Sequence, residues 1–98
     1  MKILAIDKIL PAATEEKIYA HLPQEAAKAW ELQKSGVVRE LYFRQDRGGA
    51  VLIMECPDVE TARKVIDDLP LVKAGLVEFD LIPLGAFKPF ETLFAPKE

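Results

Sequence analysis

The stretch GVVRELYFRQDRGGAVLIMEC, residues 36–56, decides the fold of this chain. It holds two runs of strand-forming residues, 37–43 and 50–55, joined by a turn from Gln45 to Gly49, which is the pattern of an antiparallel hairpin. Outside it, residues 2–6 and 76–84 read as strands. A helix is expected from the N-cap Thr14 to Gly36, and a second helix after the N-cap Asp58. The predicted order is therefore β-α-β-β-α-β.

Two segments support this order because they repeat each other. TEEKIYAHLP (14–23) and TARKVIDDLP (61–70) share Thr, Lys, a β-branched residue, Leu and Pro in register, although Pro23 is expected to kink or restart the first helix. Such a weak repeat is typical of a split β-α-β arrangement. We predict a single α+β domain over residues 1–98, a ferredoxin-like sandwich with a four-stranded antiparallel sheet and both helices on one face.

Both faces of the central strands are apolar, yet two helices cover only one face. An apolar sheet face is not stable in water, so a second copy of the chain is expected to cover it. The C-terminal tail, residues 86–98, carries three of the five phenylalanines in a stretch too short to fold alone. We expect this tail to pack on the partner subunit of a homodimer or higher homo-oligomer.

Composition narrows the function classes. The formal net charge of −3 argues against a nucleic-acid partner or an anionic membrane surface. The first and third strands also lack the aromatic residues that RNA-recognition domains of this topology use for stacking. With one histidine and one cysteine, no metal site is expected. The first apolar run stops at Asp7, too short for a signal peptide or membrane span, so a cytoplasmic location is expected.

Three residues stand out as candidates for chemistry. Glu25 lies near Leu22 and Ala29 on the apolar stripe of the first helix, and Arg39 shares a predicted strand face with apolar neighbours. Charges at such positions are normally paired or functional, so either a structural Glu25–Arg39 ion pair or a ligand pocket fits the pattern. His21 lies one turn before Glu25, at the pocket rim or in solvent.

Further along the hairpin, Tyr42 and Arg44 complete the set of candidate substrate-binding residues. Arg44 is predicted on the strand face opposite Arg39, where solvent or a subunit contact is the alternative to a ligand.

Several of these segments resemble the muconolactone delta-isomerase family. The similarity rests on ELQKSGVVRELYFR, ECPDVETA and DLPLVKAGLVEFDLIPL, and it covers most of the chain from Glu25 onward. The resemblance implies a dimeric α/β barrel that shifts a double bond in an unsaturated lactone carboxylate of aromatic catabolism without a cofactor. Glu25 and Arg39 fall on family positions that also carry Glu and Arg. Glu40, Arg47 and Gly48 differ from the family's His, His and Tyr.

The resulting hypothesis is a cofactor-independent, isomerase-like protein acting by proton transfer on a small carboxylated lactone or ring. Glu25 would move the proton with help from His21, and Arg39 would bind the substrate carboxylate. Two alternatives stay open: a non-catalytic homodimer that binds a small hydrophobic acid, and a structural oligomer without any ligand.

Overall fold

The computed structural model describes residues 1–94 and 96. Its elements follow the predicted order, with one additional short helix and a 3₁₀ turn near the C-terminus. The elements are β1 (Lys2–Ile9), α1 (Glu15–Ser35), β2 (Val38–Phe43), β3 (Ala50–Glu55), α2 (Val59–Asp67), α3 (Pro70–Lys73), β4 (Val77–Leu84) and η1 (Lys88–Leu93).

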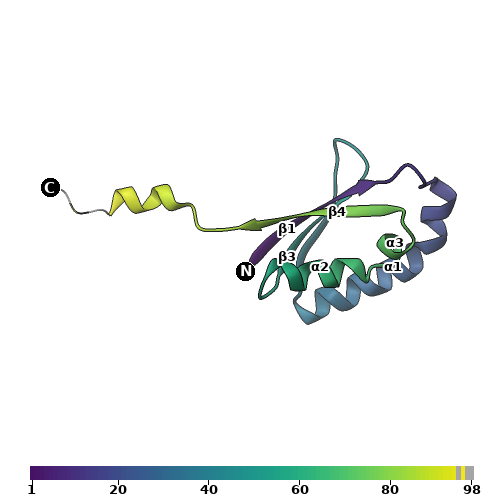
Figure 1. Ribbon diagram of the computed structural model, residues 1–98, viewed down its shortest axis with the longest axis horizontal. Helices are drawn as coiled ribbons and strands as arrows, with labels where there is room; N and C mark the ends of the chain where they lie inside the picture. Colours follow the sequence, from purple (N-terminus) through teal and green to yellow (C-terminus); the bar gives the residue numbers. More distant parts are fainter. Residues whose placement is uncertain (95, 97–98) are drawn as a thin grey trace.

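The four strands form one antiparallel sheet in the order β2-β3-β1-β4. The central strand β1 pairs with β3 (Leu4 opposite Ile53) and with β4 (Leu4 opposite Ile82). Helices α1 and α2 lie on the same side of this sheet (Figure 1). The predicted ferredoxin-like α+β architecture is confirmed.

The helix boundaries follow from local chemistry that the sequence shows. The Thr14 side chain accepts a hydrogen bond from the Lys17 amide, and Gly36 ends α1 in the left-handed conformation (φ 85°). The Asp58 side chain caps α2 in the same way, through the Thr61 amide. Helix α1 is one helix that includes Pro23, so the predicted restart at that residue does not occur.

The hydrophobic core lies between the sheet and the helices. Alternate residues of β1 and β3, such as Ile3, Ala5, Leu52 and Met54, are buried there together with Ile66 of α2. Burying each large aliphatic side chain stabilises the fold by about 1.5–3 kcal/mol. This face of the sheet is therefore the main source of stability for the domain.

Strand β2 carries an irregularity that changes its predicted faces. Val38 pairs with Met54 and Glu40 with Ile53, so Arg39 is an extra residue, as in a β-bulge. As a result Val38 lies on the helix-covered face with Leu41, whereas Arg39, which was expected to share a face with its apolar neighbours, does not lie there. That expectation was wrong because the bulge shifts the alternation by one residue.

The other face of the sheet is covered by no element of this chain within the described residues. The C-terminal segment runs away from the body beyond β4 (Figure 1). Phe87 and Phe90 contact each other edge to face (centroids 4.9 Å apart), yet both are more than 60% exposed, as is Phe94. Residues 95, 97 and 98 of the predicted tail lie outside the described part of the chain.

No helix among the described residues has the length and apolar character needed to cross a membrane.

Candidate functional site

A cavity of about 490 Å³ lies between α1 and the sheet. Most of its lining is aliphatic or aromatic, and two carboxylates, Asp7 and Glu25, are the exceptions. The remaining lining residues are Leu22, Ala26, Ala29, Leu32, Val38, Leu41, Tyr42, Phe43, Ala50, Leu52, Leu69, Leu71 and Phe79. The volume is in the range of sites for small organic molecules, and the composition is that of a pocket with a few polar groups.

Asp7 comes from β1, where it continues the inward alternation of Ile3 and Ala5. The residue is only 8% exposed, and its Oδ1 is buried without a hydrogen-bond partner in the described chain. Burial raises the pKa of the Asp7 carboxyl, while the Ala50 amide and the guanidinium groups of Arg47 and Arg44 lower it to a smaller extent. A buried acceptor without a donor is costly to keep, and the residue that carries it lines the cavity, which makes Asp7 a candidate functional residue.

Asp7 was not among the site residues expected from the sequence, where it was interpreted only as the end of the first apolar run. The alternation of the strand could have identified it: residues 3, 5 and 7 lie on one face, so the side chain of residue 7 points toward the core with those of residues 3 and 5.

Gly49 allows the backbone of the hairpin to lie against this carboxylate. It adopts φ +133°, and a Cβ atom placed there would lie 2.5 Å from Asp7 Oδ1. Only glycine fits both the backbone conformation and the space. The end of the β2–β3 hairpin is therefore built around the Asp7 side chain.

Glu25 lies in the middle of α1, half-buried, and its Oε1 accepts a hydrogen bond from the Leu71 amide at 3.0 Å. That amide belongs to the first turn of α3, which has no side-chain cap of its own at Leu69. Glu25 thus satisfies an orphan helix donor across the cavity.

The electrostatics of Glu25 depend on its neighbours. Burial raises the pKa of the Glu25 carboxyl; the Leu71 amide opposes this rise, the charge of Asp7 adds to it, and His21 opposes it weakly. The charge of Asp7 thus disfavours ionisation of Glu25.

His21 is half-buried one turn before Glu25, but it does not line the cavity. Its Nδ1 lies 2.8 Å from the Lys17 carbonyl oxygen. Since a carbonyl only accepts, Nδ1 carries the proton and donates, which fixes the ring on its own helix. His21 therefore does not contact the cavity, and only the positive charge of its protonated ring acts on Glu25.

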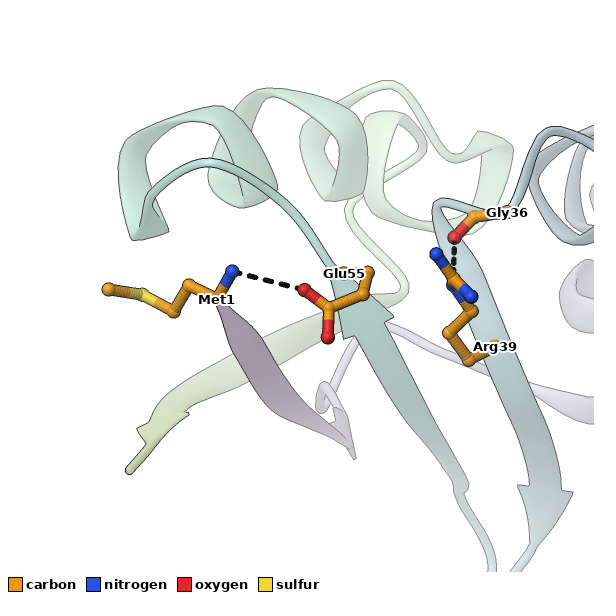
Figure 2. Close-up of polar contacts among 4 residues, drawn as sticks. All are labelled: Met1, Gly36, Arg39 and Glu55. Carbon is orange, nitrogen blue, oxygen red and sulfur yellow. Dashed lines mark hydrogen bonds and ion pairs between the residues drawn. The ribbon is translucent and has the colours of Figure 1, made fainter. Parts of the chain in front are cut away.

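Arg39 does not reach Glu25 in this structure, so the predicted Glu25–Arg39 ion pair is not formed. As the bulge residue, Arg39 is exposed, and its Nε donates to the Gly36 carbonyl at 2.7 Å (Figure 2). Its charge acts on Glu55, a residue of the opposite sheet face, whose carboxylate bonds the N-terminal amine at 3.0 Å. The extra residue in β2 is the physical reason for this placement.

Tyr42 lines one edge of the cavity, yet its hydroxyl donates to Glu40 Oε1 at 2.9 Å. Arg44 does not line the cavity and binds Asp46 with two nitrogens, at 2.8 and 2.6 Å. This contact holds the pKa of Asp46 at about 2. Arg44 and the exposed Arg47 lie in the hairpin close enough for their charges to act on Asp7.

The arrangement suits proton transfer between carboxyl groups and a bound molecule. Two carboxyl groups with raised pKa values line an apolar cavity, and a carboxyl group with a raised pKa is a stronger base than a solvated one. Among residues 1–94 and 96, no cluster of three or more His, Cys, Asp or Glu side chains is placed to hold a metal ion.

Comparison with known proteins locates the fold. No protein-family model matches the sequence, and no curated protein matches it significantly. Among solved structures, the chain is similar to 5-chloro-2-hydroxyhydroquinone dehydrochlorinase from Burkholderia phenoliruptrix, in complex with 2,5-dihydroxybenzoquinone. The match has a TM-score of 0.65 and 19% identity, and it covers 91% of this chain and 98% of the other. At that identity the two proteins share the fold.

Proposed function

We propose that this protein is an enzyme in which Glu25 and Asp7 move protons to and from a small ring compound bound between α1 and the sheet. One observation carries the proposal: two carboxyl groups, one of them buried without a hydrogen-bond partner in the described chain, line a cavity that is otherwise largely apolar.

Glu25 is the general base in this proposal. The Leu71 amide holds one of its oxygens at 3.0 Å, which orients the carboxylate and leaves the second oxygen to accept a proton. Burial raises the pKa of Glu25 toward the range where a base is both ionised and able to take a proton. Asp7, on β1, donates a proton to another atom of the ring, and exchange with solvent then restores both carboxyl groups.

Two reactions fit this proton transfer. The resemblance to muconolactone delta-isomerases suggests a double-bond shift, in which a proton leaves one carbon and returns to another. The name of the structural neighbour suggests loss of hydrogen chloride from a chlorinated, hydroxylated ring. Both reactions need proton transfer to or from the ring. The double-bond shift takes a proton from one ring carbon and adds one to another, whereas loss of hydrogen chloride takes protons from ring hydroxyl groups and adds one to the carbon that releases chloride. Both reactions belong to aromatic catabolism.

A carboxylated lactone is the second candidate substrate. The charges of Arg47 and Arg44 both act on Asp7 from the hairpin, but Arg44 is bound to Asp46. Arg47 is therefore the candidate for the role that was expected of Arg39. In this alternative Arg47, rather than Arg39, binds the carboxylate at the cavity edge.

The same proposal includes a homodimer or higher homo-oligomer. The uncovered sheet face carries Leu4, Ile6, Val51 and Ile53 with only partial burial, and Ile82 is 42% exposed. A second copy of the chain would remove this apolar surface from water.

Deuterium exchange tests the proton transfer and does not require the product to be identified. Unsaturated lactones, hydroxylated rings and aromatic acids are incubated with the protein in D₂O, and loss of ring C–H signals is followed by NMR. Glu25→Gln is expected to slow exchange by about 10²–10⁴-fold, the usual contribution of a general base. Asp7→Asn is expected to slow it as well.

Glu31→Gln, an exposed substitution of the same type on the same helix, is the matched control. Exchange that survives both cavity substitutions would contradict the assigned roles. Ligand binding without exchange would instead identify a non-catalytic binding protein.

A further inference from the structure

The charges that face the cavity are all negative. None of the residues that line it in the described part of the chain is Lys, Arg or His, and the two that carry a carboxyl group are Asp7 and Glu25. The one phenol, Tyr42, is already bound to Glu40.

The basic groups around the cavity are engaged elsewhere or lie outside it. Arg39 donates to Gly36 and Arg44 binds Asp46 with two nitrogens. Lys28 of α1 is outside the cavity lining and pairs with Asp68 at 3.1 Å. Arg47 is exposed in the hairpin turn, and His21 is held by the Lys17 carbonyl.

This distribution sets the chemistry of a ligand. A carboxylated ring would place a third negative charge in an apolar space that already holds two carboxyl groups, at a cost in both desolvation and repulsion. A hydroxyl group has the opposite property, because its O–H donates to a carboxylate oxygen in a charge-assisted hydrogen bond. The carboxyl groups of Asp7 and Glu25, which both line the cavity, supply such acceptors.

We propose that the cavity is specific for neutral rings with at least two hydroxyl groups, which donate to Asp7 and Glu25, and that it discriminates against carboxylated rings. The inference rests on the proposed function only for the location of the site. Asp7 and Glu25 both line the cavity, whose volume of about 490 Å³ accommodates a single substituted ring.

Three compounds separate charge from size: catechol, 3,4-dihydroxybenzoate and methyl 3,4-dihydroxybenzoate. Their dissociation constants are measured by calorimetry at pH 7 with the whole chain. Catechol and the methyl ester are expected to bind at least tenfold more tightly than the acid. The ester is the largest of the three, so a preference for it over the acid reports charge and not volume.

Substitutions test whether Asp7 and Glu25 cause the discrimination between ester and acid. Asp7→Asn and Glu25→Gln together are expected to reduce the gap between ester and acid to less than threefold, while the exposed pair Asp67→Asn and Glu31→Gln leaves it unchanged. Equal or tighter binding of the acid overturns the inference, and loss of that binding in Arg47→Gln would identify the cation responsible.

The two proposals fail separately. Tight binding of the acid, with deuterium exchange that depends on Glu25, would overturn the inference while the proposed function stands. Failure of all three compounds to bind overturns the inference, and the exchange assay on lactones then decides the proposed function by itself. Selective binding of the neutral rings without exchange would support the inference and overturn the enzymatic proposal.

Discussion

Substitution of Gly49 by alanine tests the contact on which the candidate site is built. The new Cβ would lie 2.5 Å from Asp7 Oδ1, far inside normal contact distance, and φ at this residue is +133°. The backbone conformation alone costs a non-glycine residue about 1–3 kcal/mol. Forcing an extra carbon against a packed side chain adds about 1–3 kcal/mol.

The expected loss in free energy of unfolding is therefore about 2–6 kcal/mol, the sum of these two ranges. Because small domains are stable by only about 5–15 kcal/mol, Gly49→Ala is a severe substitution. Urea denaturation followed by circular dichroism measures the loss. Gly75→Ala is the matched control: Gly75 has φ +73°, but no atom lies within 4 Å of the point that its Cβ would occupy, so it should show the backbone cost alone.

A double-mutant cycle isolates the contact. In an Asp7→Ala background the steric part should disappear, so the two substitutions together should cost about 1–3 kcal/mol less than the sum of their separate effects. If Gly49→Ala fails to fold, the double variant should fold. If the effects of the two substitutions add to within about 0.5 kcal/mol, the reasoning is refuted, because the new Cβ would then not clash with the Asp7 side chain.

The site and the tail carry three further predictions. The folded state binds a proton on Asp7 more tightly than the unfolded chain does, so the stability of the wild type should fall as the pH rises from the ordinary carboxyl pKa of 3.8 to the raised pKa. Asp7→Asn should lose this slope and be more stable at pH 7, by about 1.4 kcal/mol for each pH unit between the two pKa values. Urea titrations at several pH values measure the slope, and an unchanged slope in the variant would contradict the burial of a charge. The acid limb of the deuterium-exchange rate should shift to lower pH in Asp7→Asn, because removal of its charge lowers the pKa of Glu25; a shift to higher pH would show that the two groups do not interact in this way. Truncation after Gly85 should weaken the oligomer in sedimentation experiments, since Phe87, Phe90 and Phe94 are exposed in one chain, and an unchanged number of subunits per particle would show that they do not contact a partner.

The fold was predictable from the sequence because its signals are local. The capping residues Thr14 and Asp58, the stop at Gly36 and the alternation of residues 50–54 each depend on a few neighbouring positions. Glu25 could also be placed in the helix stripe that faces the sheet, because helical periodicity is regular over the whole of α1.

The partners of the site residues were not predictable in the same way. The position of Arg39 depends on an extra residue in the β2–β3 pairing, and nothing in the composition of VVRELYF announces a bulge. The role of Asp7 was readable from alternation, but its contact with Gly49 depends on how the hairpin closes over β1. Periodicity thus gave the directions of the side chains, whereas register decided which of them meet.

The hydrogen bond from the Leu71 amide to Glu25 makes the backbone of α3 a reporter of events in the cavity. A carboxylate is a stronger acceptor than a neutral carboxyl group, so uptake of a proton by Glu25 weakens the bond that protects this amide. The solvent-exchange lifetime and chemical shift of the Leu71 amide should therefore follow the protonation of Glu25 during titration with acid or ligand. A single nitrogen-15 resonance, from a residue outside the chemistry, would record each change in the charge of the site.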